Sequence, residues 1–469
     1  MAYPSFAKQY GVWSEKAQSY QISAAWQAGL GNASTAGAFL GTLLNGYLVP
    51  KFGMKQATLG GLIVLSFFLS IVFFAPNIET LMLGSFLCGF PFGIFASVAP
   101  AYASEVLPLP LRVYFTSYTN MCWIIGQLIA ALVLAELVSI ESSWGFRIPF
   151  AIQWIWPAFL IPTLLFAPES PWHLVRCNRL AEAEHSIIRL QTKNVKTLDA
   201  KHALDDIIHT NELENNMDVG ASYIDCFKGF ELRRTIIACM CQASQILSGA
   251  PFAYSSTYFY QQAGLSVGQT YWLNVFGTTL ALVGTMISWF WLMPSFGRRQ
   301  IFIYGFAGMA GVLCFIGLLN IIPNTGMAQA LLTVVWILVF QLSAGQLGWA
   351  LPAEVGSTRL RQKTVCLARD TYHLCSVVAS VVQPFCMNPD AWDLKGYTGF
   401  LWGATALATT VWAYYELPET KGRSFEELDV LFSRRVSARN FERSVVDVTD
   451  DGPRSEGVEL MAQVRDDQS

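Results

Sequence analysis

Long apolar segments recur along the whole 469-residue chain and constrain its fold more than any other feature. A helix needs about 20 apolar residues to cross the hydrocarbon core of a bilayer. Only 13% of the residues are charged, whereas soluble domains carry about a quarter. We therefore expect an all-α polytopic membrane protein with about eleven transmembrane helices. The segments lie at about 24–48, 57–75, 80–104, 113–138, 148–167, 235–261, 269–293, 300–322, 326–351, 365–388 and 397–416.

A short motif occurs twice, each time between two apolar segments. It reads PKFGMKQ at residues 50–56 and PSFGRRQ at residues 294–300. Glycine permits a tight backbone turn, and basic residues hold a loop on the cytoplasmic side. Two chance loops are the alternative, but the matching places favour a duplicated unit of six helices around a central site. By that count the N-terminal half is one helix short.

The expected organisation has four parts. Residues 1–167 form an N-terminal half of five helices, 168–234 a central loop, 235–416 a C-terminal half of six helices, and 417–469 a tail. Lys and Arg gather in the central loop, the tail and alternate short loops, which places these parts in the cytoplasm and the N-terminus outside. The chain shows no signal peptide, and the end of its charged tail is expected to be disordered.

Five motifs together identify the chain as similar to a known family. They are YASEV at 102–106 followed by Arg112, PESPWHL at 168–174, GRR at 297–299, GWALPAEV at 348–355 followed by Arg361, and LPETKGRSFEEL at 417–428. These resemble signatures of the sugar porter family of the major facilitator superfamily, over nearly the whole chain. The stretches RIPFAIQWIWP, FAPESPW and NPDAWDLKGYTGFLWG resemble fungal α-glucoside, or maltose, permeases. The resemblance implies proton symport of maltose or related glucosides across the plasma membrane.

Amide and aromatic side chains inside the apolar segments are candidates for binding a sugar, because amides both donate and accept hydrogen bonds and aromatics stack on the ring. The resemblance places Gln127, Gln245 and Trp349 on sugar-contacting positions and Tyr372 near the site. Gln242 lies three residues before Gln245, on the same helical face. The alternatives are hydrogen bonding between helices for the glutamines and simple packing for Trp349.

Charged residues also repeat at the predicted cytoplasmic ends of helices. Glu105 and Glu354 each end an apolar segment, and an arginine, Arg112 or Arg361, follows each of them seven residues later. Together with Arg298 and Arg299 of the repeated turn, they are predicted to form a gating network of ion pairs. The alternative is solvated loop charge of little energetic weight.

Proton coupling requires a titratable group inside the membrane. The candidates are Asp370, which is adjacent to Arg369, and His373, although a helical histidine is more often a hydrogen-bonded core residue. In the resembled family the coupling acids lie on the first helix, which this chain lacks, and Ala38 takes the place of a second-helix glutamate. The sequence therefore supports the transporter fold more strongly than proton coupling.

Other function classes are disfavoured by what the sequence lacks. It has no CxxC pair, P-loop, dinucleotide fingerprint or nucleophile–base set, so no enzyme activity, metal or cofactor is expected. The expected partners are a sugar, protons and the lipid bilayer, with no nucleic acid. A sugar sensor and an inactive truncated carrier are the alternatives, and the short tail argues against a sensor. Small residues at Gly37 and Gly41, and at Ser85, Gly89 and Gly93, predict close helix packing.

Overall fold

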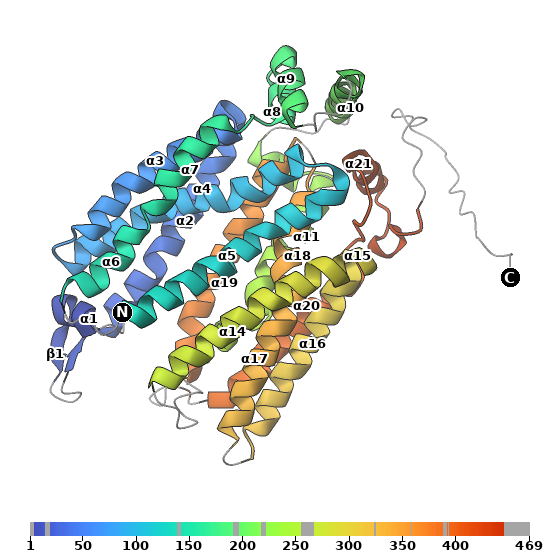
Figure 1. Ribbon diagram of the computed structural model, residues 1–469. Helices are drawn as coiled ribbons and strands as arrows, with labels where there is room; N and C mark the ends of the chain where they lie inside the picture. The colour runs from blue at the N-terminus through green and yellow to red at the C-terminus, as the bar shows by residue number, and fades with distance from the viewer. Residues whose placement is uncertain are drawn as a thin grey trace.

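The computed structural model describes residues 4–14, 19–137, 142–190, 197–216, 222–254, 267–322, 325–357, 359–387, 392 and 394–444. Nearly all of the regular structure is helical (Figure 1), which confirms the all-α class. Within the described residues, one small sheet pairs β1 (Val12–Ser14) antiparallel with β2 (Ser19–Gln21). The predicted disorder of the tail concerns its last residues, 445–469, which lie outside these ranges.

The N-terminal part begins with the short helix α1 (Pro4–Tyr10) and the β1–β2 hairpin, where the sequence predicted a loop. The five predicted apolar segments of this part correspond to helices. These are α2 (Ala24–Phe52), α3 (Met54–Phe73), α4 (Ile78–Val106), α5 (Leu109–Leu137) and the pair α6 (Trp144–Ile152) and α7 (Ile155–Phe166).

The predicted central loop is largely helical. It contains α8 (Pro171–Arg176), α9 (Leu180–Leu190), α10 (Thr197–Asn216) and the 3-10 helix η1 (Tyr223–Phe227). Ser170 accepts a hydrogen bond from the His173 amide at 3.4 Å and caps α8, which has proline at its first position. Leu174, Val175 and Ala183 bury together against α10. Local caps and one small apolar cluster therefore build helices inside a polar stretch.

The C-terminal part contains the remaining helices. They are α11 (Glu231–Leu247), α12 (Ala250–Tyr254), α14 (Val267–Ile287), the π-helix η2 (Ser288–Leu292), α15 (Met293–Ser295), α16 (Arg298–Leu319), α17 (Gly326–Leu342), α18 (Ala344–Val355), α19 (Arg361–Met387), η3 (Lys395–Tyr397), α20 (Thr398–Glu416), α21 (Phe425–Ser433) and η4 (Ala438–Asn440). Among the described residues, 8 helical stretches are long and apolar enough to cross a membrane. The predicted count of about eleven also includes α2, α5 and α20.

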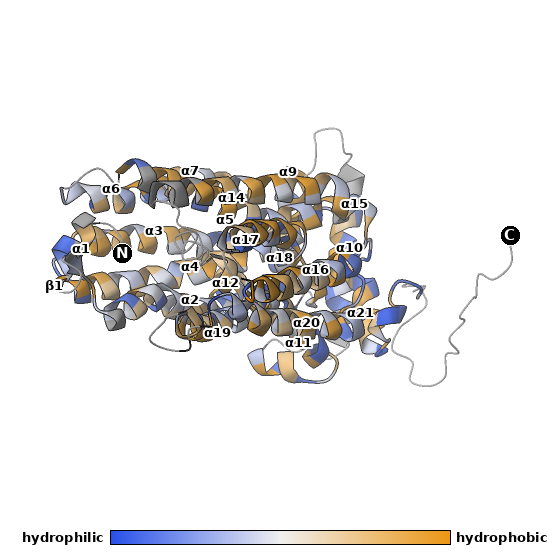
Figure 2. Cartoon of the chain, turned by 90° about the horizontal axis from the view of Figure 1, so that it is seen from below, coloured by the Kyte–Doolittle hydropathy of each residue, from blue (hydrophilic) through white to orange (hydrophobic). Residues whose placement is uncertain are grey.

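The helices form two groups that meet along their length (Figure 1). An N-terminal group holds α2, α3, α4, α6 and α7, and a C-terminal group holds α11, α16, α17, α18, α19 and α20. Between the groups, α2 packs on α19, and α5 packs on α14 and α18. Helices α8, α9, α10 and α21 lie together at one end, which we call the α21 end, opposite α1 and β1. Hydrophobic residues cover most of the helical surfaces, and hydrophilic residues gather around α10 and α21 (Figure 2).

Helices α2 and α4 pack backbone to backbone through the predicted small-residue faces. A Cβ atom on Gly37 would lie 1.9 Å from the Phe86 carbonyl oxygen, and one on Gly93 would lie 2.2 Å from the Ala38 carbonyl oxygen. Gly41 and Gly89 face backbone atoms at similarly short distances. Glycine is therefore required along this interface, because any side chain would push the two helices apart.

Two predicted helices of the C-terminal group are broken. The segment expected at 235–261 breaks after Ser248, where Gly249 has a φ of 95° that favours glycine. The segment expected at 326–351 breaks at Ser343, with φ −131° and ψ −86°. Trp336 of α17 donates from Nε1 to the Ser248 carbonyl at 3.2 Å, beside the first break. Broken helices next to polar side chains are a recurring feature of binding sites in transporters.

Candidate functional site

One amide side chain and three aromatic side chains surround a buried arginine, Arg369, of the C-terminal group. Arg369 of α19 donates from Nη1 to Gln242 Oε1 of α11 at 3.4 Å. Its guanidinium carbon lies 4.5 Å from the ring centre of Trp349, 4.0 Å from that of Tyr372 and 5.9 Å from that of Trp123. We call these five residues the Arg369 cluster. It unites α11, α18 and α19 with α5, and three of its members are predicted sugar-binding residues.

Gln245 lies one turn after Gln242 and is also buried. Its Nε2 donates to the Gly345 carbonyl of α18 at 3.5 Å. A Cβ atom on Gly348 would lie 2.3 Å from the same Nε2, so a glycine leaves the space that the amide fills. Gln245 thus makes the helix-to-helix hydrogen bond that was the alternative to sugar binding.

The structure differs from the predicted set of sugar-binding residues at Gln127, which is not a member of the Arg369 cluster, and at Arg369, which was not predicted. Gln127 has an exposed side chain on α5, one turn beyond Trp123, which is the α5 member of the cluster. Arg369, at the centre of the cluster, was not predicted to bind a sugar. The available signal was a cation inside an apolar segment, because such residues are rare and usually functional.

Asp370 and His373 are buried on α19 without hydrogen-bond partners. Within the described residues, neither carboxylate oxygen of Asp370 and neither ring nitrogen of His373 has a partner. The hydrogen-bonded core histidine that was the alternative for His373 is therefore not what the structure shows. Arg369 faces the aromatic cluster instead of Asp370, as expected for adjacent helical residues. Across all of the described residues, no group of three or more His, Cys, Asp or Glu side chains gathers to hold a metal.

An ion-pair network joins the two groups at the α21 end. Glu105 of α4 is buried and lies 3.8 Å from Arg361 Nη1 of α19 and 3.5 Å from Arg176 Nη2 of α8. The hydroxyl of Ser170 donates to the same carboxylate. The spacing suggested a pair with Arg112, but the ion pair forms with Arg361, across the interface between the groups.

Phe425 of α21 lies between two arginines from different helices, Arg112 of α5 and Arg361 of α19. The guanidinium carbon of Arg112 is 3.7 Å from its ring centre, and that of Arg361 is 3.6 Å away. Each such cation–π contact contributes about 0.5–2 kcal/mol, depending on its desolvation. Glu354 accepts a hydrogen bond from the Thr420 hydroxyl at 2.6 Å. We call Glu105, Arg176, Arg361, Arg112, Phe425 and Glu354 the seam network.

The two copies of the repeated turn are each held by a glutamate from a second repeated motif. Glu169 of PES accepts from the Met54 amide at 3.0 Å, at the start of α3. Glu419 of PET accepts from the Arg298 amide at 2.8 Å, at the start of α16. A carboxylate at a helix N-terminus satisfies free amides and matches the helix dipole. The repeated turn is therefore half of a two-part structure that occurs twice.

The two glycines of the repeated turn have different reasons to be glycine. Gly53 has a φ of 90°, as the tight turn predicted. Gly297 has an ordinary φ of −71°, which other residues also adopt, so its backbone conformation alone does not require glycine. A Cβ atom at Gly297 would lie 2.1 Å from Glu419 Oε2, so the glycine provides space for the carboxylate.

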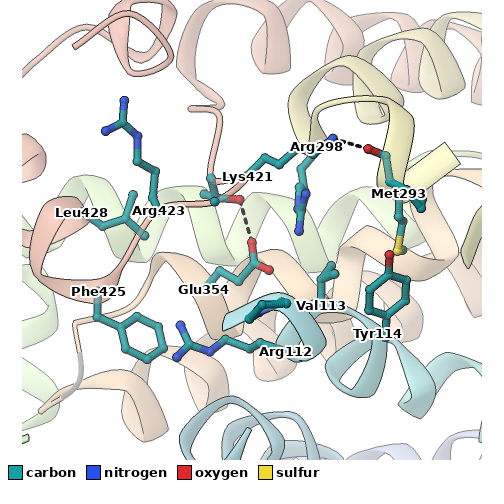
Figure 3. A pocket seen from close by; sticks show the side chains of 14 residues that line it. Arg112, Val113, Tyr114, Met293, Arg298, Glu354, Lys421, Arg423, Phe425 and Leu428 are labelled. Atoms are coloured by element: carbon teal, nitrogen blue, oxygen red, sulfur yellow. Dashed lines mark hydrogen bonds between the residues drawn. The ribbon is translucent and has the colours of Figure 1, made fainter. Parts of the chain in front are cut away.

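The neighbouring arginines of the second turn point to different surroundings. Arg298 is buried and 8% exposed, and its side chain lies near Glu354 (Figure 3). Arg299 donates from Nη2 to the Tyr414 carbonyl at 2.7 Å on α20. Only Arg298 of this predicted pair lies beside the seam network.

His173 of α8 lies close to the seam network but adds no charge to it. Burial lowers the pKa of His173 below its ordinary value, so the imidazole is neutral near pH 7. The positive charge beside Glu105 therefore comes from Arg176 and Arg361.

Comparisons with known proteins agree on one family. The family described as "Sugar (and other) transporter" matches residues 1–432. Maltose permease MAL31 of Saccharomyces cerevisiae is 37% identical over 453 residues, covering 95% of this chain and 74% of that protein. The general alpha-glucoside permease of the same organism is 35% identical over 453 residues, covering 95% and 73%.

Solved structures share the fold. The proton:xylose symporter XylE bound to 6-bromo-6-deoxy-D-glucose aligns with a TM-score of 0.80 at 21% identity, covering 91% of this chain and 93% of that chain. The inward open conformation of XylE from E. coli aligns with a TM-score of 0.63 at 19% identity, covering 91% and 94%.

Proposed function

Because this chain belongs to the sugar transporter family, we propose that it carries an α-glucoside such as maltose across the plasma membrane by alternating access. The observation that carries this proposal is the Arg369 cluster, where an amide and three aromatic rings surround a buried cation. Such side chains suit a ligand that combines hydroxyl groups with an apolar ring face. The similarity to two permeases named for maltose and α-glucosides supports the substrate class.

In this proposal the seam network is the gate on the cytoplasmic side. Hydrophilic residues gather at the α21 end (Figure 2), and the central loop and tail are rich in Lys and Arg, which supports a cytoplasmic orientation for this end and for the C-terminus. Opening that end requires α4 to part from α19, which separates Glu105 from Arg361. It also requires Phe425 to lose at least one of its two arginines. Alternating access requires the opposite end to be closed while the α21 end is open.

Uptake of labelled maltose by transporter-null yeast that express the chain tests the proposal. We expect uptake above that of cells with empty vector, competed by unlabelled α-glucosides. Surface abundance is measured in parallel with a tagged chain. Uptake at the empty-vector level, with normal surface abundance, rejects the carrier and favours a sensor or an inactive protein.

Trp349→Ala is expected to weaken maltose binding by about tenfold, which corresponds to about 1.4 kcal/mol. The substitution removes the ring that Arg369 stacks on and the surface offered to the sugar. The measurement is the KM for uptake, with Trp291→Ala as the control, because Trp291 is 73% exposed on the outer surface. An unchanged KM in Trp349→Ala contradicts the stacking role.

Proton coupling is the second element of the proposal, with Asp370 as the proton carrier and His373 one turn away. Both are buried without hydrogen-bond partners among the described residues, and buried ionisable groups in membrane helices usually have a function. Asp370→Asn keeps the shape of the side chain but accepts no proton.

We expect Asp370→Asn cells to exchange labelled for unlabelled maltose but no longer to alkalinise the medium when maltose is added. External pH and counterflow are the two measurements. Glu79→Gln is the matched control, because Glu79 is an exposed acid in the first turn of α4. Wild-type alkalinisation by Asp370→Asn excludes Asp370 as the proton carrier.

A further inference from the structure

A cavity of about 290 Å³ opens at the α21 end, beside the seam network (Figure 3). Its wall combines α5 of one half with α15, α16 and α18 of the other, and the segment from Thr420 to Leu428 closes one side. Four lining residues are cationic and one is acidic: Arg112, Arg298, Lys421, Arg423 and Glu354. The cavity is therefore strongly positive, although the whole chain has a net charge of −3.

The charges on this wall are unevenly compensated. Arg423 pairs with Glu427 at 3.6 Å, whereas Glu354 accepts from the neutral Thr420 hydroxyl and keeps its negative charge on the wall. Lys421 donates to the Pro294 carbonyl at 2.6 Å, which holds the ammonium at the rim without neutralising it. Within the described residues, no carboxylate lies at ion-pair distance from Arg112 or Arg298. The charges of Arg112 and Arg298 act on Glu354, which balances them only in part, and with Lys421 the wall keeps an excess of positive charge.

The burial and hydrogen bonding of Arg298 indicate that the cavity can bind a ligand. Its side chain is more than nine-tenths buried, with 8% exposed, and its Nε has no hydrogen-bond partner among the described residues. Figure 3 shows its guanidinium directed into the cavity, toward Glu354 and Arg112. A buried donor without a partner carries a desolvation penalty, so a ligand that accepts from it relieves that penalty when it binds. The Nε of Arg112 is likewise unsatisfied on the opposite wall.

We propose that this cavity binds a phosphate group, carried either by a small soluble anion or by a lipid headgroup. Guanidinium groups bind phosphate oxygens through paired hydrogen bonds, and a lysine ammonium adds a point charge. Arg112 belongs to α5 and Arg298 to α16, so one phosphate touching both bridges the two halves of the molecule. Such a ligand stabilises the closed α21 end, and with it the state in which transport from that end is blocked. This inference does not depend on the identity of the transported sugar.

The first test measures the thermal unfolding of the purified full chain in an uncharged detergent. Inorganic phosphate is expected to raise the apparent Tm in a concentration-dependent way, beyond sodium chloride at equal ionic strength. Arg298→Gln is expected to remove this rise, because it deletes the buried charge while keeping the backbone amide that Glu419 binds. Arg299→Gln is the matched control, since the Arg299 side chain faces Tyr414 and not the cavity. If Arg298→Gln does not fold, Lys421→Gln takes its place.

The second test separates the two sources of phosphate. The chain is reconstituted in phosphatidylcholine vesicles with and without phosphatidylinositol 4-phosphate, and its unfolding is followed again. A shift with inorganic phosphate in detergent identifies a soluble anion, and a shift only with the phosphorylated lipid identifies a headgroup; in both cases the shift must disappear in the cavity variant. No shift with either probe, or an equal shift in wild type and variant, overturns the proposal.

Discussion

Gly93→Leu is expected to abolish accumulation of the folded chain. A Cβ atom at this position would lie 2.2 Å from the Ala38 carbonyl oxygen and 2.8 Å from the Thr42 amide nitrogen. Both are backbone atoms of α2, so no side-chain rotation relieves the overlap. Membrane helices associate through close packing of small residues, because lipid offers no hydrophobic force between them. A leucine side chain at position 93 therefore separates α2 from α4, and the N-terminal group loses the packing between these two helices.

The measurement is the monodisperse peak of a fluorescent fusion in detergent size-exclusion chromatography. The folded peak is expected to fall by at least about tenfold, because native proteins are only marginally stable and do not tolerate the loss of a whole helix–helix interface. Gly60→Leu on α3 is the matched control, because nothing lies within 4 Å of a Cβ atom at Gly60. A wild-type peak for Gly93→Leu is incompatible with the observed packing of α2 and α4.

Glu105→Gln is expected to open the α21 end. The buried carboxylate lies at ion-pair distance from both Arg361 and Arg176, and the side chain of Arg361 is 0% exposed. Removing one partner of a buried ion pair costs roughly 3–5 kcal/mol, because the remaining charge stays buried. That cost applies only to the closed state, so the ratio of open to closed molecules is expected to rise by more than about a hundredfold.

Cys366 of α19 reports on this opening without an introduced label. Its thiol is fully buried and lies 4.0 Å from Asn45 Nδ2 of α2, at the interface between the groups. Maleimide modification of Cys366, measured by peptide mass spectrometry, is expected to be at least about tenfold faster in Glu105→Gln. Glu182→Gln is the control, because its pair with Arg179 is exposed and contributes little. Equal modification rates in wild type and Glu105→Gln would show that the pair does not hold the closed state.

Much of the fold could be predicted from local pattern. Apolar length locates the membrane helices, because the bilayer imposes the same requirement on each segment independently. The small-residue faces of α2 and α4 were also predictable, since spacing of four places residues on one side of a helix. The breaks at Gly249 and Ser343 were not, because contacts from other helices lie beside them: Trp336 donates to the Ser248 carbonyl, and Ser288 donates to the Leu342 carbonyl.

The candidate site was predicted less completely than the fold. Gln242, Trp349 and Tyr372 were all candidates, and the structure brings them together around Arg369. Arg369 was considered only as the neighbour of Asp370 in the search for a titratable group, so its aromatic stacking partners were not predicted. A cation on an apolar helix has several possible partners, and only the packed helices decide which of them it reaches.

The sequence by itself determines an all-α fold of membrane helices with repeated motifs, because apolar length and motif repetition are properties of the chain alone, and its resemblance to a known family adds sugar transport. Only the tertiary structure decides that Glu105 pairs with Arg361 and that Phe425 lies between two arginines. It also decides that Glu169 and Glu419 hold the two repeated turns. The physical reason is the same in each case. The strength of a charge interaction depends on distance in space, and these partners come from segments that meet only when the helices pack.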